Sequence, residues 1–272
     1  MSESIDHDTK GTDSPSVATS NPNDTIYASI RTPDPPFSLP KRILIIGGGP
    51  AGLVALRNLI KHGGFDKVAL VERRSDVGGV WNLERDDEET KGEGEKDVPR
   101  KPKWPSPAYP GLIGNVLPKF LSFSGAPFPE RPLPDDAADP HGKHPQPFPS
   151  LDETQAYLRA FAEPFLAEGL IRLNTEAISV EERGWGEGWK VVLRDWNDEN
   201  EPGKQLEEIW DGVVLAVHWY DFPVWPQTPG LDELKALGLA RHAKEWRGPQ
   251  TAGCEGKVCQ AVSLCNMILF LR

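Results

Sequence analysis

Apolar runs in the first third of the chain alternate with a glycine-rich turn and an amphipathic stretch. Four β-favouring apolar residues, Ile43 to Ile46, lead into the turn, and apolar residues then recur at helical spacing from Leu53 to Ile60. Another apolar run, Lys67 to Val71, predicts the next strand. Strand, turn, helix and strand in this order predict a βαβ unit within a parallel sheet, and hence an α/β fold.

The same patterns predict a long helix and further strands downstream. Ser150 and Glu153 have the spacing of a capping box, and apolar residues follow at roughly helical spacing as far as Leu166. Residues 171–180 predict two strands that lead back to the first sheet. Residues 189–195 and 205–217 predict an antiparallel β-meander that ends in a buried strand, Trp210 to Val217. We therefore expect a Rossmann-like parallel sheet with an antiparallel meander on it.

The glycine-rich turn carries a dinucleotide-binding pattern. Gly47, Gly49 and Gly52 fit Gly-x-Gly-x-x-Gly in the strand–turn–helix context that this pattern requires. The first glycine permits the tight turn, the second lets the backbone approach a pyrophosphate, and the third lets the helix pack on the strand. Pro50 and Ala51 open the helix, whose N–H groups and dipole would face the phosphates. The alternative is a glycine turn that binds nothing.

The residues after the second strand indicate which dinucleotide would bind. Glu72 follows the last glycine of the pattern by twenty residues, where a carboxylate accepts hydrogen bonds from an adenosine ribose and disfavours a 2′-phosphate. Gly79 would let the backbone lie against a flat ligand, and Trp81 offers an apolar plane beside it. Arg73 and Val80 are candidate contacts in the same stretch. The alternative is a solvated turn with Trp81 filling the core.

Taken together, these two segments resemble the flavin-containing monooxygenases and the related Baeyer–Villiger enzymes. In that family a Gly-Gly-x-Trp segment follows the ribose-binding Glu and contacts FAD, so the resemblance implies FAD. Residues 109–118 resemble the family's Tyr-x-x-Leu-x-x-Asn segment, in which an Asn lies near the flavin ring and the nicotinamide. The resemblance thus makes Asn115 a candidate catalytic residue, whose amide would stabilise a flavin peroxide; a plain Gly-Asn turn is the alternative. It also places the backbone near Ala177 close to the adenine.

The resemblance implies a reaction as well as a cofactor. NADPH would reduce FAD, O₂ would add to give a C4a-(hydro)peroxyflavin, and a nucleophilic N or S atom or a ketone of a small-molecule substrate would be oxygenated. The cofactor carries this chemistry, while the protein orients it and excludes water. One alternative is a catalytically inactive FAD-binding remnant or an unstable fragment. Another is a disulfide reductase, for which the chain lacks a Cys pair near the first domain.

Two segments differ from the family's pattern. His218 stands where the family has a glycine that lets the backbone pass close to the cofactor. Further on, Gly238, His242 and Trp246 match the motif Phe-x-Gly-x-x-x-His-x-x-x-Trp/Tyr, but Ala236 replaces its aromatic residue. The resemblance implies that His242 links two nucleotide-binding domains; an exposed residue at the end of a helix is the alternative.

We expect three parts in the chain. Residues 1–40 would form a disordered leader, residues 41–222 an FAD-binding domain with insertions at 85–103 and 130–147, and residues 223–272 a linker and the truncated start of an NADPH-binding domain. The family's second glycine motif is missing, because no glycine follows Gly256. An incomplete second domain would leave its apolar partner surface exposed, which favours self-association.

Composition and charge narrow the set of partners. With 30 basic and 41 acidic residues the net charge is −11, which argues against nucleic acid or an anionic membrane as a partner. The apolar residues Val262 to Leu271 are too few for a membrane anchor, and the N-terminus lacks a secretory signal, so we expect a cytoplasmic protein without stable membrane insertion. His141 and His144 lie in proline-rich chain that would orient imidazoles poorly, and we expect no metal site.

Overall fold

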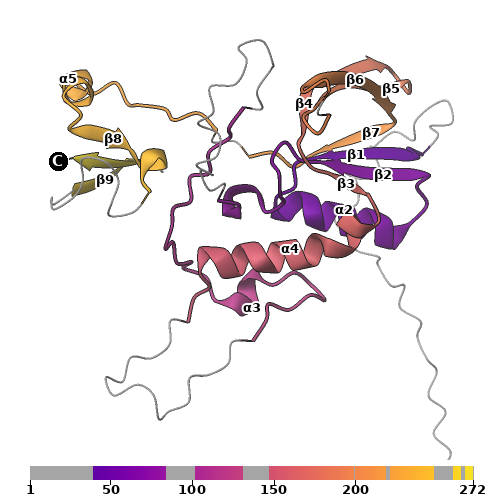
Figure 1. Cartoon of the computed structure of the whole chain (residues 1–272), viewed down its shortest axis with the longest axis horizontal. Helices are drawn as coiled ribbons and strands as arrows, with labels where there is room; N and C mark the ends of the chain where they lie inside the picture. Colours follow the sequence, from indigo (N-terminus) through magenta and orange to yellow (C-terminus); the bar gives the residue numbers. More distant parts are fainter. Residues whose placement is uncertain are drawn as a thin grey trace, which may run out of the picture. The chain divides into compact units, whose positions relative to one another are not determined.

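The computed structural model describes residues 39–83, 102–130, 147–198, 200–218, 221–247, 260–264 and 267–271 (Figure 1). The chain divides into two units, Met1–Leu39 and Pro40–Arg272, and every described helix and strand lies in the second. The expected leader and both expected insertions fall almost entirely outside the described residues, as do His141 and His144. The domain bounds therefore stay predictions.

The first sheet is parallel and consists of four strands in the order β3–β2–β1–β7. β1 (Arg42–Ile46) lies in the middle and pairs with β2 (Lys67–Val71) and β7 (Gly212–Leu215), while β3 (Ile171–Arg172) pairs with the other side of β2. In both β1 and β2 the last four residues are buried. Such continuous apolar strands are typical of a parallel sheet covered on both faces.

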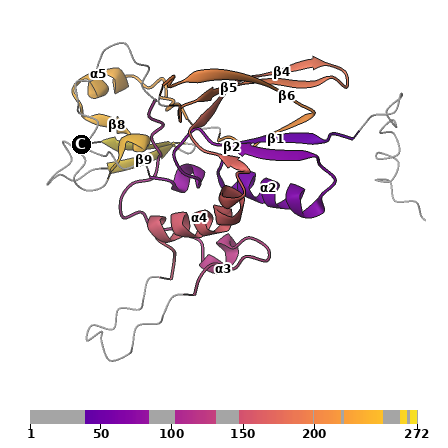
Figure 2. The same cartoon turned by 45° about the vertical axis from the view of Figure 1, so that its right-hand side comes forward.

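Two helices cover one face of this sheet (Figures 1 and 2). α2 (Pro50–His62) begins with a proline, whose missing N–H costs nothing at a helix start, and its buried residues include Leu53 and Leu56. α4 (Leu151–Ala167) begins at the predicted capping box: the Glu153 N–H donates to Ser150 Oγ at 3.2 Å, and the Ser150 N–H donates to Glu153 Oε2 at 2.7 Å. The strand–turn–helix unit and the long helix are confirmed.

An antiparallel meander covers the other face. β4 (Thr175–Gly184), β5 (Gly188–Asp195) and β6 (Lys204–Trp210) form this second sheet in chain order. Val191, Leu193 and Trp210 of the meander pack in one buried cluster with residues of β1 and β2. The predicted α/β fold with a parallel sheet and a separate antiparallel meander is confirmed.

One expected strand is divided in two. The sequence predicted a single buried strand from Trp210 to Val217, but Trp210 is the fully buried end of β6 and Gly212 begins β7 in the other sheet. Asp211 between them turns the chain, and its Oδ2 accepts the backbone N–H groups of Lys41 and Arg42 at 2.7 and 2.8 Å. β7 is also only partly buried, because it is an edge strand of the parallel sheet.

The remaining elements are short. Two of them precede the meander, η1 (Gly79–Trp81) and α3 (Pro118–Leu121). The C-terminal part, after β7, contains α5 (Leu231–Ala236), β8 (Ala240–His242), η3 (Ala243–Glu245), β9 (Gln260–Leu264) and β10 (Met267–Leu271). β8, β10 and β9 form an antiparallel sheet in that order (Figure 2). The described residues of the mainly apolar stretch 262–271 thus belong to a strand pair, β9 and β10. None of the described helices has the length and apolar character to cross a membrane. The start of a second nucleotide-binding domain stays a prediction.

Candidate functional site

The glycine-rich loop after β1 is shaped by close backbone contacts. Gly47 has φ +111°, and a Cβ atom there would lie 2.6 Å from the carbonyl oxygen of Ala216, which follows β7. At Gly52 in α2, a Cβ atom would lie only 1.9 Å from the carbonyl oxygen of Gly47. The first and third glycines are therefore required by the protein's own packing, which agrees with the geometry that the pattern predicts.

Gly49 is in a different situation. It is the N-cap residue of α2 with φ −76° and ψ −179°, an extended conformation that any residue adopts. The nearest atom to a Cβ built there is the Cα of Gly79, at an ordinary 3.7 Å. The fold alone would accept a side chain at this position. What Gly49 provides is a bare stretch of backbone at the start of a helix, where N–H groups favour an anion.

The segment after β2 brings a second glycine pair against the first. Gly78 and Gly79 have φ of +115° and +57°, and a Cβ atom on Gly79 would lie 3.1 Å from the Cα of Gly49. Gln155 of α4 fixes this segment, because its Nε2 donates to the carbonyl oxygen of Val77 at 2.7 Å. Two bare backbone segments thus meet side by side.

A cleft of about 330 Å³ opens where these segments meet. It lies at the carboxyl ends of β1, β2 and β7, since Ile46, Val71 and Ala216 line it. The strand order reverses between β1 and β7, and ligands of open α/β sheets bind at such a switch point. Nine predicted cofactor contacts line this cleft: Gly47, Gly49, Pro50, Ala51, Glu72, Arg73, Gly79, Val80 and Ala177.

Three other predicted residues do not line the cleft. Gly52 is buried where α2 meets the glycine loop, and Trp81 packs against the core formed with α2 and α4. Asn115 is exposed, in a bend of the segment that precedes α3. Its catalytic role stays a prediction.

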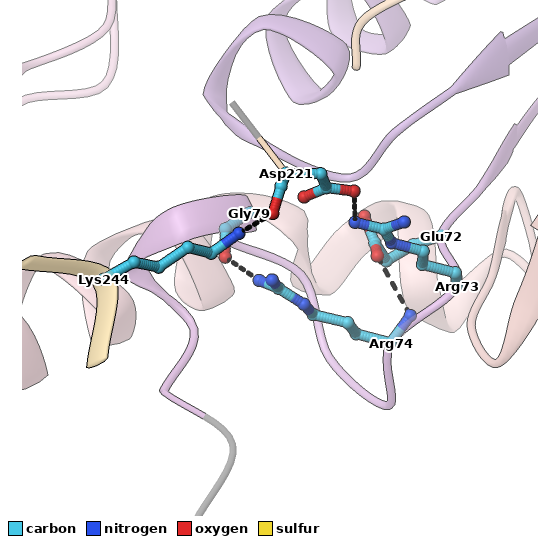
Figure 3. Close-up of polar contacts among 6 residues, drawn as sticks. All are labelled: Glu72, Arg73, Arg74, Gly79, Asp221 and Lys244. Atoms are coloured by element: carbon cyan, nitrogen blue, oxygen red, sulfur yellow. Dashed lines mark hydrogen bonds and ion pairs between the residues drawn. The ribbon is translucent and has the colours of Figure 1, made fainter. Parts of the chain in front are cut away.

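Glu72 is buried beneath the glycine loop, with 7% of its surface exposed. Its Oε2 accepts the N–H of Gly48 at 2.7 Å, and its Oε1 accepts the N–H of Arg74 at 2.9 Å (Figure 3). Each carboxylate oxygen has two lone pairs, so these bonds orient the group and leave acceptor capacity for a ribose hydroxyl.

Three cations, Arg73, Arg74 and Lys244, line the cleft together with three carboxylates, Glu72, Glu176 and Asp221. Figure 3 shows the contacts of Asp221 with two of these cations. Arg73 Nη2 donates to Asp221 Oδ2 at 2.5 Å, and Arg74 Nη1 donates to the carbonyl oxygen of Gly79 at 2.5 Å. Lys244 Nζ, from η3, donates to the backbone carbonyl oxygen of Asp221. Asp221 thus connects the end of β2 to the segment after β8.

These contacts shift the pKa values of two groups. Burial by itself would raise the pKa of Asp221, but Arg73, Lys244 and Arg74 outweigh it and lower that pKa. The pKa of Lys244 is lowered by burial and further by the neighbouring Arg74, Arg73 and Arg247, against the opposing effect of Asp221. Lys244 thus lies near three arginines, although the lining of the cleft holds equal numbers of basic and acidic side chains.

The Asp221 pair predicts a pH-dependent contribution to stability. Because the folded-state pKa lies below the ordinary value near 3.8, the stabilisation is fully present above that value and is lost as pH falls through the folded-state pKa. We expect Asp221→Asn to lower the free energy of unfolding at pH 7 by less than about 1 kcal/mol, since the pair is partly solvated. Urea titrations of both proteins from neutral pH to below pH 3.8 measure this difference, which should shrink towards the acid end.

Asp232→Asn is the matched control, because it removes a carboxylate from an exposed pair with Lys235. We expect no measurable loss of stability from it. A difference between wild type and Asp221→Asn that stays constant over the whole pH range would contradict the electrostatic assignment.

Several residues of the cleft were not predicted. Pro107, Thr175, Glu176, Val217 and Asp221 line it, as do Arg74, Ala216, Lys244 and His218, of which only His218 drew attention in the sequence. Arg74 could have been inferred from its place beside Arg73. Asp221 and Lys244 carry no local signal, because they reach the cleft only through the way the chain returns to it after β7.

His242 lies in β8 and not at the end of a helix. Its Nδ1 accepts the N–H of Lys244 at 3.1 Å. Its ring packs edge to face against the ring of Trp225, with the ring centroids 5.6 Å apart. Burial lowers its pKa, which favours the neutral imidazole that can accept this bond. His242 thus shapes the turn that carries Lys244, while its expected role in linking two domains stays a prediction.

Comparison with known proteins shows which family has this arrangement. The family described as "NAD(P)-binding Rossmann-like domain" matches residues 45–99. Flavin-containing monooxygenase FMO GS-OX-like 9 of Arabidopsis thaliana is 32% identical over 209 residues, which cover 74% of this chain and 42% of that protein. FMO GS-OX-like 2 of the same plant is 31% identical over 249 residues, covering 87% of this chain and 48% of that protein.

The chain belongs to the flavin-containing monooxygenase family. A solved member, S-allyl-L-cysteine S-oxygenase from Allium sativum, superposes with a TM-score of 0.52 and 27% sequence identity over 70% of this chain and 39% of that one. The chain spans less than half the length of the curated family members that it matches.

Proposed function

We propose that this chain forms the FAD-binding part of a flavin-containing monooxygenase, which uses NADPH and O₂ to oxygenate an N or S atom or a ketone of a small molecule. The observation that carries the proposal is the cleft at the switch point of the sheet. There the backbone of Gly49 meets that of Gly79, beside a buried, oriented Glu72. The family relationship supports flavin as the group that this cleft accepts.

The residues present fit a dinucleotide with a diphosphate. The N-terminus of α2 and the bare backbone at Gly49 offer N–H groups and a positive dipole end to the phosphates. Glu72 would accept a hydrogen bond from the adenosine ribose, and the backbone at Ala177, which also lines the cleft, would lie beside the adenine.

When bound, the flavin supplies the redox chemistry that couples NADPH to O₂. The described side chains need only hold the dinucleotide and fix its orientation. Arg74 holds the carbonyl oxygen of Gly79 and so keeps the second glycine segment against the first. Asn115 is proposed to donate its amide to the reacting end of the cofactor.

The substrate class is part of the proposal. The similar protein from Allium sativum is an S-oxygenase of S-allyl-L-cysteine, a thioether. A thioether is therefore the first substrate class to test, ahead of amines and ketones.

The deciding experiment is the visible absorption spectrum of the purified chain, before and after denaturation and then with NADPH added without oxygen. We expect flavin peaks, release of free FAD on denaturation, and bleaching by NADPH. Bound flavin that NADPH does not bleach would restrict the function of this chain to flavin binding. A folded, colourless protein that takes up no added FAD would overturn the proposal.

A further inference from the structure

The cation that reaches the cleft from furthest along the chain is Lys244. It comes from η3, beyond the parallel sheet and the meander, yet it lines the same cleft as Gly49 and Gly79. Two contacts hold it there: its Nζ donates to the carbonyl oxygen of Asp221, and its backbone N–H donates to His242 Nδ1. These hydrogen bonds fix the position of the Lys244 ammonium group in the cleft.

This position is close to the expected path of the diphosphate. Arg74 donates to the carbonyl oxygen of Gly79, while Lys244, whose Nζ is drawn at the carbonyl oxygen of Asp221 in Figure 3, lines the same cleft as that glycine. Gly79 in turn packs against Gly49 at the start of α2. Arg74 and Lys244 thus line the cleft in which the two glycine segments meet.

The acids of the cleft are already engaged. Both oxygens of Glu72 accept backbone N–H groups, Asp221 pairs with Arg73, and Glu176 lies 3.6 Å from Arg194 Nη1. Lys244 is near acidic and basic groups at once: burial and the neighbouring Arg74, Arg73 and Arg247 disfavour its charge and lower its pKa, while Asp221 favours the charge. An anionic ligand would relieve this repulsion, and the diphosphate of a dinucleotide is the anion that the neighbouring glycine loop is built to accept.

We propose that Lys244 contacts the diphosphate of the bound dinucleotide and sets the affinity of the cleft for phosphate charge. The inference deepens the proposed function, on which it rests only in taking the ligand to be a dinucleotide. In this proposal the segment after β8 belongs to the binding site. Asp221 and His242 position Lys244, and Lys244 contacts the cofactor.

The test measures the Kd values of wild type and Lys244→Gln for ADP, AMP and adenosine by isothermal titration calorimetry. The three ligands share one base and sugar but differ in phosphate charge. We expect Lys244→Gln to weaken ADP binding about 10-fold, to weaken AMP binding less, and to leave adenosine unchanged. Lys244→Arg should stay within about 3-fold of wild type for all three, because it keeps the charge. The salt dependence of ADP binding should also be smaller in Lys244→Gln.

Lys235→Gln is the control, since it removes the same charge from a lysine on α5 that pairs with Asp232. It should leave all three affinities unchanged. An equal loss of ADP and adenosine binding in Lys244→Gln would make Lys244 a purely structural residue and overturn the inference, as would no loss at all.

The two proposals can fail separately. A wild-type chain that binds ADP but takes up no FAD would contradict the proposed flavin function and still allow the Lys244 comparison. A wild-type chain that binds FAD, with Lys244→Gln binding ADP equally well, would overturn only the role of Lys244. Binding of neither ligand by the folded wild type would overturn both.

Discussion

Gly49→Ala is expected to weaken flavin binding strongly without harming the fold. Its new methyl group would find only an ordinary 3.7 Å contact with Gly79 inside the protein, in a backbone conformation open to any residue. That methyl group would, however, occupy the space through which a diphosphate approaches the backbone. We expect the Kd for FAD to rise at least about 100-fold, which corresponds to about 2.8 kcal/mol. Flavin fluorescence titration measures the Kd, and thermal unfolding of the flavin-free protein checks the fold.

Gly111→Ala separates a loss of binding from a loss of stability. Gly111 has φ +80° and no atom within 4 Å of a Cβ built on it, and it does not line the cleft. The substitution should cost about 1–2 kcal/mol of stability through backbone strain and leave the Kd unchanged. If Gly49→Ala binds FAD as tightly as Gly111→Ala does, the cofactor does not pass this loop in the proposed way.

Gly52→Ala is expected to do the opposite and damage the fold first. Its methyl group would lie 1.9 Å from the carbonyl oxygen of Gly47, which is a backbone atom, and a Cβ atom has no side-chain torsion by which it could move away. Overpacking of this kind typically costs 1–3 kcal/mol, against a gain of roughly 1 kcal/mol from helix propensity. Because this contact is unusually short, we expect a net loss of about 3 kcal/mol or more. Urea-induced unfolding of the flavin-free protein measures it.

Gly63→Ala, at the C-terminal end of the same helix, is the matched comparison. Gly63 has φ +68° but open space around it, so only backbone strain of about 1–2 kcal/mol applies. A Gly52→Ala protein as stable as Gly63→Ala would show that α2 can move away from the loop, and that the third glycine is not needed for packing.

Those parts of the fold with strong local patterns could be predicted from the sequence. The β1–α2–β2 unit has continuous apolar strands and a glycine turn, and α4 has a capping box, so local chemistry already specifies them. The strand expected from Trp210 to Val217 was wrong in its bounds, although the Asp-Gly pair is a local turn signal that could have marked the break at Asp211. Its carboxylate turns the chain by accepting N–H groups from the start of β1, a partner 169 residues away.

The residues of the candidate site also differ in whether the local sequence identifies them. Residues within the two glycine segments, such as Gly49, Glu72 and Gly79, could be found because their spacing alone matches the chemistry of a dinucleotide. Asp221 and Lys244 could not, since a charged residue in a linker resembles any solvated charge until the chain is folded. The sequence allowed two interpretations of Trp81, as a contact of the flavin or as a side chain that fills the core. The structure places it against the core and outside the lining of the cleft.

The pairing of β1 with β7 has a consequence for how the molecule assembles. The glycine loop and the strand that closes over it are encoded at opposite ends of the domain, and their ladder joins Ile43 to Gly212. A contact between such distant residues forms late, because the entropy of closing the intervening chain must first be offset. The cleft is complete only when β7 has docked, because Ala216 and Val217 belong to its lining. We therefore expect a dinucleotide to bind the assembled sheet more tightly than a partly folded chain, and so to stabilise the native state by mass action.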